Sequence, residues 1–231
     1  MRNNTFLSIG LTRKEITWGV RYLLFQSIFL APLLQSINWL LPSAMNAAQL
    51  NFLFFTVNFL VVLWIFQKYL LQFLHVDFMD VLRILAVGSV FFALYWWAST
   101  LLSELLIWIN PDFANINDQS IIAMSQGNYT LMFIGTVIFV PITEECLHRG
   151  LIFRGLYSRS PLAAFAVSTT VFCLIHVINY AGYPLPALIL SFMQYIPAGL
   201  CLAGAYRLSG SLLCPIVIHA AINAMGMLAL R

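Results

Sequence analysis

The chain of 231 residues is 61% hydrophobic and only 8% charged, with a formal net charge of +3. A soluble globular domain carries about 25% charged residues, so this composition indicates an integral membrane protein with several spans. Nucleic-acid binding is also excluded, because no basic patch with interleaved aromatic residues occurs in the sequence. We expect a single integral membrane domain over residues 1–231.

Apolar segments of about 20 residues, the length that spans a bilayer as a helix, recur along the chain. They predict an all-α, polytopic fold of about seven transmembrane helices, at residues 19–41, 50–71, 82–109, 130–157, 161–180, 185–206 and 211–230. The first of these is longer than the apolar core of a cleaved signal peptide, so we expect it to be retained. The longest connection, residues 110–130, is polar and is expected to lie outside the cell.

The distribution of Lys and Arg predicts the orientation in the membrane, because cytoplasmic connections carry an excess of these residues. They occur at the N-terminal end of the chain and in, or flanking, the even-numbered connections, as Arg2, Arg13, Lys14, Arg21, Lys68, Arg83, Arg149, Arg154, Arg159 and Arg207. The odd-numbered connections hold none, and only Arg231 falls on the other side. The pattern predicts a multi-pass protein of the cell membrane with a cytoplasmic N-terminus.

The fourth predicted span contains two adjacent carboxylates, Glu144 and Glu145, followed by Arg149. Ionisable side chains at this depth cost several kcal/mol and by default mark a functional site. Glu145 and Arg149 are four residues apart with the acid first, the favourable order for a helical ion pair. This pairing leaves Glu144 as the carboxylate that is free for chemistry.

Three further polar residues lie in later spans: His176 in the fifth, and His219 and Asn223 on one face of the seventh. Counting helical rise from the connecting turns places them at similar depth to Glu144, in a layer reached from the cytoplasmic side. A carboxylate and an imidazole can hold a water molecule and take its proton, while an imidazole and a carboxamide can donate hydrogen bonds to an oxyanion. The pattern therefore predicts hydrolysis, with Glu144 and His176 in the first role and His219 and Asn223 in the second.

Two other kinds of site fit part of this pattern. Glu144, His176 and His219 would make a three-ligand zinc site with an open position, although the paired His residues of the H-E-x-x-H zinc proteases are absent. Intramembrane Glu and His residues also build proton relays in transporters, but the chain shows no internal symmetry of the kind that transporters have. We therefore expect an enzyme without a metal or another cofactor.

Three motifs resemble those of the CAAX protease and bacteriocin-processing family (CPBP, or Abi). They are Glu144-Glu145-x-x-x-Arg149, Phe172-x-x-x-His176 and His219-x-x-x-Asn223, which occur in this order on successive predicted spans within residues 130–230. The N-terminal half matches the family only as generic membrane helices.

The resemblance implies an all-helical intramembrane glutamate endopeptidase with a conical cavity open to the cytoplasm and to lipid. It implies that Glu144 and His176 activate water, that His219 and Asn223 form the oxyanion hole, and that Glu145 and Arg149 support the site. Family members remove the last three residues of prenylated CaaX proteins in eukaryotes, and bacterial members are linked to peptide-pheromone or bacteriocin maturation and to immunity. The implied partners are membrane lipid and a peptide or protein substrate.

One residue departs from the family pattern. The position before the motif Arg is commonly Phe, but here it is His148. Because His148 follows Glu144 by four residues, it can pair with that carboxylate and alter its proton affinity; a structural or interfacial role is the alternative. Some related proteins are scaffolds, so a non-proteolytic immunity or scaffold protein that binds a peptide or partner is the alternative function.

Overall fold

The protein is described by a computed structural model that covers residues 10–73 and 75–231, and every regular element in these ranges is helical. Arg2, which entered the orientation argument, lies outside the described residues. The elements are α2 (Arg13–Phe25), η1 (Gln26–Leu30), α3 (Ala31–Leu40), α4 (Ala47–Ile65), α5 (Gln67–Leu71), α6 (Phe78–Ile109), α7 (Ile116–Gly127), α8 (Tyr129–Ile134), η2 (Gly135–Phe139), α9 (Val140–Glu145), η3 (Cys146–Phe153), α10 (Arg154–Tyr157), α11 (Pro161–Ile175), η4 (Ile178–Tyr180), α12 (Leu185–Gln194), α13 (Ile196–Ser209) and α14 (Leu213–Leu228).

Within the described residues, five helical segments are long and apolar enough to cross a membrane: Arg13–Leu40, Ala47–Ile65, Phe78–Ile109, Tyr129–Tyr157 and Leu185–Ser209. The chain is therefore a multi-pass membrane protein with an all-α fold. Two of the seven predicted spans are shorter than expected. The fifth and seventh apolar segments form helices of 15 and 16 residues, α11 and α14.

Polar residues at the helix starts explain where several elements begin. Thr12, Asn46 and Asp77 each cap a helix, and each forms a reciprocal capping box with the residue three positions on. Such a box satisfies backbone N–H groups that have no partner inside the helix. Gly210, with φ of 71°, ends α13 in the left-handed conformation that glycine adopts without strain.

Prolines account for three irregular turns inside the long helices. Pro32 and Pro141 each follow a five-residue π-helical segment, η1 and η2 respectively. Pro197 follows the break at Tyr195 that divides α12 from α13. Proline lacks the N–H group and its ring clashes with the carbonyl four residues earlier, so the preceding turn widens or breaks. π-helical turns are common at functional sites, and η2 and η3 flank the segment α9 that carries Glu144.

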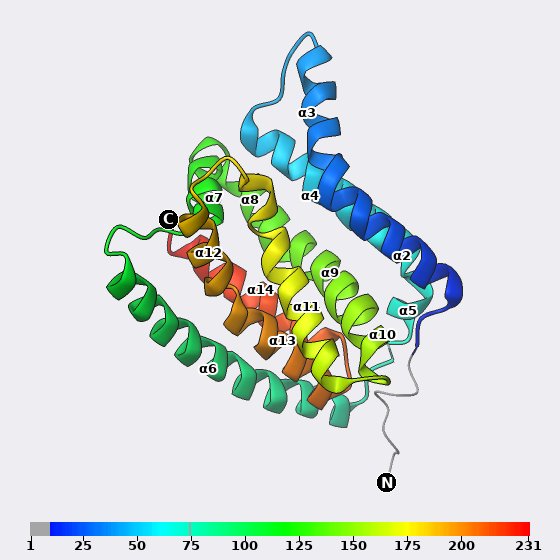
Figure 1. The fold of residues 1–231 in the computed structure, drawn as a ribbon. Coiled ribbons are helices and arrows are strands. Elements are labelled where there is room, and N and C mark those ends of the chain that lie inside the picture. The colour runs from blue at the N-terminus through cyan, green and yellow to red at the C-terminus, as the bar shows by residue number, and fades with distance from the viewer. Residues whose placement is uncertain (1–9, 74) are drawn as a thin grey trace.

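The two ends of the bundle differ in charge. Figure 1 shows α5, α10 and the start of α6 at one end, and α7 and the C-terminus at the opposite end. We call the first the cation-rich end, because the described Lys and Arg residues other than Arg149 and Arg231 lie near it along the chain. The other is called the α7 end. α7 belongs to the polar 110–130 connection and packs against α4, α8 and α12.

A buried apolar cluster fills the cation-rich end. It joins side chains from α2, α4, α5, η3, α11, α13 and the start of α14, among them Phe66, Tyr69, Phe153 and Tyr206. The hydroxyl groups of Tyr69 and Tyr206 are hydrogen-bonded at 2.6 Å, and both residues are buried. Glu15 of α2 accepts a hydrogen bond from the Tyr69 backbone N–H at 2.9 Å, which ties α2 to this cluster.

Candidate active site

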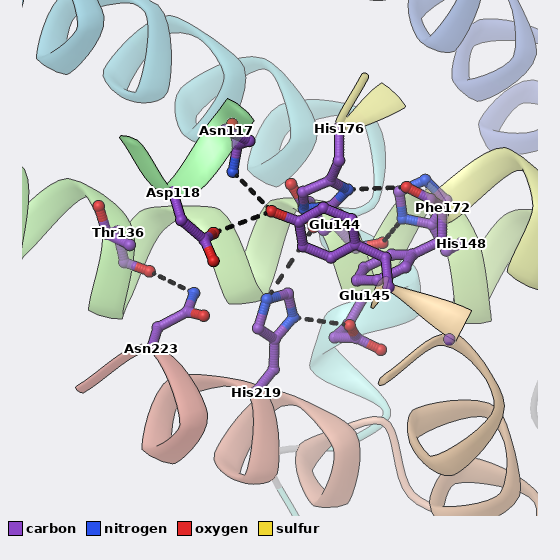
Figure 2. Close-up of polar contacts among 12 residues, drawn as sticks. Asn117, Asp118, Thr136, Glu144, Glu145, His148, Phe172, His176, His219 and Asn223 are labelled. Carbon is purple, nitrogen blue, oxygen red and sulfur yellow. Dashed lines mark hydrogen bonds and ion pairs between the residues drawn. The ribbon is translucent and has the colours of Figure 1, made fainter. Parts of the chain in front are cut away.

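Glu144 lies near the middle of the Tyr129–Tyr157 helix, on α9, where its side chain faces two histidines from other helices (Figure 2). Its Oε2 is 3.9 Å from His176 Nε2 and 4.0 Å from His219 Nε2. This Oε2 is buried and makes no hydrogen bond to any described residue. The three predicted residues therefore meet around one carboxylate oxygen that has no protein partner within hydrogen-bonding distance.

His176 occupies the C-terminal end of α11, which ends at Ile175 instead of continuing to residue 180 as predicted. Its Nδ1 donates to the Phe172 carbonyl at 2.7 Å, which leaves Nε2 directed toward Glu144. The ring of Tyr195 stacks on the imidazole, with ring centroids 4.2 Å apart. Backbone and aromatic ring together fix the tautomer and the orientation of His176, as the partner of one ring nitrogen determines the state of the other.

His219 connects the two adjacent carboxylates. Its Nδ1 donates to Glu145 Oε1 at 2.9 Å, while its Nε2 faces Glu144. The same Glu145 oxygen accepts from Arg149 Nη1 at 3.0 Å, so the ion pair predicted from the spacing is present. Glu145 and Arg149 are fully buried. The pair therefore positions the imidazole of His219 from within the protein.

Arg149 makes two further contacts that hold it in place. Its Nη2 donates to the Gly199 carbonyl of α13 at 3.0 Å, and its guanidinium lies over the ring of Phe172 at 4.6 Å. Gly199 lies so close to α11 that an added Cβ would come within 2.6 Å of Thr169. The missing side chain thus allows the α13 backbone to approach α11 closely and to reach the guanidinium. Phe172 packs at the centre of the site, against His148, His176 and the guanidinium.

His148 does not contact the Glu144 carboxylate, contrary to the first of the two roles considered for it. Its Nδ1 donates to the backbone carbonyl of Glu144 at 2.7 Å, and its ring packs edge-on against Phe172. His148 is completely buried, with an exposed fraction of 0%. It therefore does not lie at the membrane interface. The hydrogen bond to the carbonyl turns the side chain back along its own helix instead of toward the carboxylate.

Replacement of His148 by Phe, the residue common in the family, is expected to leave activity unchanged. The change removes one hydrogen bond to the Glu144 carbonyl, but it also removes the buried Nε2, which has no partner among the described residues. Each of these contributions is about 1–3 kcal/mol and they oppose each other, so we expect a similar unfolding midpoint in detergent. A marked loss of cleavage rate in a folded His148→Phe variant would contradict the structural role.

Asn223 lies one helical turn beyond His219 on α14, and its side chain reaches across to η2. Its Nδ2 donates to the Thr136 carbonyl at 2.9 Å, which leaves the second hydrogen of the amide for another acceptor. The contact fixes the carboxamide in the wall of both cavities described below. Its oxyanion role stays a prediction.

Two adjoining cavities, of about 240 and 390 Å³, meet at the site. They share seven lining residues: Asp118, Ile121, Thr136, His176, Tyr195, His219 and Asn223. The smaller one includes Glu144 and extends to η4 and α7, and the larger one runs between α6 and α14. Both extend toward the α7 end, whereas the expected entrance was at the cation-rich end, which the apolar cluster fills.

Residues of α7 approach the site in a way that the sequence did not predict. The Tyr195 hydroxyl donates to Asp118 Oδ1 at 3.0 Å and accepts from Asn117 Nδ2 at 3.0 Å, so α7 is joined to the ring that stacks on His176. Part of the Asp118 side chain is open to the cavity, yet the surrounding protein removes enough water to raise the pKa of its carboxyl group. The Tyr195 hydrogen bond and His176 oppose this increase.

The sequence contains a recognisable pattern only for the position at which α7 begins. Asn115 precedes Asp118 by three residues, which is a common pattern at a helix N-terminus, and its side chain accepts from the backbone N–H groups of Asn117 and Asp118. Nothing in that pattern indicates that the helix folds back over residues 60 to 80 positions later in the chain. Within residues 10–73 and 75–231, no group of three or more His, Cys, Asp or Glu side chains is arranged to hold a metal ion.

The fold and the site define a multi-pass helical membrane protein that encloses carboxylates, imidazoles and a guanidinium within its bundle. Residues 126–225 match the family model described as type II CAAX prenyl endopeptidase Rce1-like, and this part of the chain belongs to that family. The match covers all three motifs and confirms the resemblance seen in the sequence. No curated protein and no solved structure matched the chain. Membership implies an intramembrane protease that acts on a peptide or protein.

Proposed function

We propose that the protein is a metal-independent intramembrane glutamate endopeptidase, in which Glu144 is the general base. The observation that carries the proposal is the buried Glu144 Oε2, which lies 3.9 and 4.0 Å from two imidazole nitrogens and has no hydrogen bond to the described protein. These separations exceed a direct hydrogen bond, but one water oxygen can lie about 2.8 Å from the carboxylate and from an imidazole nitrogen at the same time.

In the first step Glu144 accepts a proton from this water, and the oxygen attacks the carbonyl carbon of the scissile peptide bond. His176 holds the water through Nε2, because its Nδ1 is occupied by the Phe172 carbonyl. The tetrahedral intermediate then collapses, the C–N bond breaks, and Glu144 returns the proton to the leaving amine. One carboxylate thus serves as base and then as acid, a role that requires hydrogen-bond reach to both atoms.

Charge on the oxyanion is stabilised by His219 and Asn223 in this mechanism. In this step Nδ1 of the imidazolium form of His219 donates to the Glu145 carboxylate, and Nε2 donates to the oxyanion. The second amide hydrogen of Asn223 supplies a further donor beside it. Donors that are fixed before the reaction contribute most to oxyanion stabilisation, and here the Arg149–Glu145 pair and the Thr136 carbonyl fix them.

Hydrolysis is tested by mass spectrometry of membrane-derived peptides from cells with and without the protein. We expect defined fragments that appear only with the protein and that persist when membranes are treated with a metal chelator. Fragments that disappear with the chelator and return with zinc would overturn the metal-independent mechanism. Identical peptide profiles, with the phenotype of the protein retained, would instead support a non-proteolytic scaffold or immunity role.

A further inference from the structure

The cation-rich end offers no passage to the site. The cluster that closes it includes Phe66, Tyr69, Phe153 and Tyr206, each at most 1% exposed. Leu147 and Leu151, also in the cluster, lie on the Tyr129–Tyr157 helix just beyond Glu144 in the direction of Arg154. A peptide approaching from this end would have to displace tightly packed aromatic side chains, each of which contributes several kcal/mol to stability.

The path from Glu144 toward the α7 end is an open cavity lined by polar side chains. From Glu144 toward the α7 end, the wall of the smaller cavity presents Thr136, Asn51 and Asn117, and then Asn179 of η4, which is exposed. Polar side chains inside a membrane protein face a water-filled space or the bundle interior. Both cavities therefore connect the reacting atoms with the α7 end.

The cavity walls carry no cation. Among the residues that line either cavity in the described chain there is no Lys or Arg, and the acidic groups are Asp118 and Glu144. The backbone N–H groups of Asn117 and Asp118, at the start of α7, are already taken by the Asn115 side chain. A free C-terminal carboxylate is normally held by Arg, Lys or such a cluster of N–H groups, and these cavities provide none.

We infer that the substrates are internal, neutral or basic peptide segments that enter from the α7 end, which the distribution of Lys and Arg places outside the cytoplasm. The inference rests on the proposed endopeptidase function for its chemistry, but the side of entry follows from the cavities and the charge distribution alone. The natural substrates are then membrane-anchored or translocated polypeptides whose cleaved bond lies just outside the bilayer. A cytoplasmic C-terminal CaaX sequence meets neither condition.

Cysteine labelling decides the side of entry without any need for activity. Asn179→Cys places a thiol in the cavity wall, and Ser158→Cys places one on an exposed turn beside Arg159 at the cation-rich end. A membrane-impermeant maleimide is added to intact cells and, separately, to permeabilised cells. The native protein, whose four cysteines are buried or partly buried, provides the background.

We expect Asn179→Cys to react in intact cells as fully as after permeabilisation, and Ser158→Cys to react only after permeabilisation. Labelling of Ser158→Cys in intact cells, or incomplete labelling of Asn179→Cys there, overturns the inferred side of entry. This result does not depend on whether the protein is a protease. In the peptide comparison, the fragments that depend on the protein should come from segments outside the cytoplasm. Fragments that end at cytoplasmic C-terminal tails would overturn the substrate class and leave the proposed hydrolysis intact.

Discussion

Replacement of Glu144 by Gln is expected to abolish measurable peptide cleavage while the protein stays folded. The carboxamide keeps the size and shape of the side chain but cannot take a proton from water, and general-base catalysis contributes about 10²–10⁴-fold to a rate. The carboxylate Oε2 that this change converts has no hydrogen bond to the described protein, so little structure depends on it. The measurement is the initial rate of the purified protein in lipid nanodiscs on a peptide identified from membranes.

The matched control is Glu104→Gln, the same chemical change at an exposed position of α6. It should leave the rate unchanged, and the unfolding midpoints of both variants should equal that of the native protein. A folded Glu144→Gln variant that retains full activity would contradict the general-base role. It would direct attention to His176 and His219, which are the other groups within 4.0 Å of that oxygen.

Replacement of Arg149 by Ala is expected to lower the free energy of unfolding by about 3–5 kcal/mol, because it leaves a buried carboxylate without its cation. Glu145 is fully buried, and its Oε1 accepts from both Arg149 and His219. The change also removes the hydrogen bond to the Gly199 carbonyl and the contact with Phe172. The measurement is the unfolding free energy in mixed detergent micelles.

Two variants separate the charge effect from the loss of packing. Arg159→Ala, at an exposed position, should change stability by no more than about 0.5 kcal/mol. The double variant Glu145→Gln, Arg149→Met removes both charges and retains a side chain of similar length, so it should be more stable than Arg149→Ala. If the double variant is the less stable of the two, the unpaired carboxylate is not the main cause of the loss.

Local spacing was sufficient to predict the main elements and part of the site. Hydropathy located the apolar segments, and the four-residue spacing of Glu145 and Arg149 identified the ion pair, because side chains at this spacing share a helical face in any ordinary helix. The motifs also named Glu144, His176 and His219, which the structure brings together. The exact ends were less predictable, since α11 ends at Ile175 although the chain beyond it remains partly apolar.

Features that depend on contacts between distant segments could not be predicted in the same way. The contact between α7 and Tyr195 depends on hydrogen bonds between residues more than 70 positions apart. The periodicity of apolar residues along the sequence gives no information about such contacts. The orientation of His148 was misjudged because the spacing rule compares side chains only, whereas Nδ1 of His148 bonds to the backbone carbonyl of Glu144. The direction of the cavities depends on which end the aromatic side chains fill, which composition alone does not reveal.

The shortness of α11 and α14 has a consequence for the surrounding lipid. At 15 and 16 residues, these helices are about 22–24 Å long, less than the roughly 30 Å hydrocarbon core of a typical bilayer. A hydrophobic mismatch of this sign is relieved by local thinning of the bilayer. His176 lies at the end of α11 and His219 lies on α14. The bilayer is therefore thinnest beside the reacting groups, and lipid headgroups and water come closest to the bilayer midplane there. The protein thereby shortens the distance between the membrane surface, where a polar peptide segment lies, and Glu144.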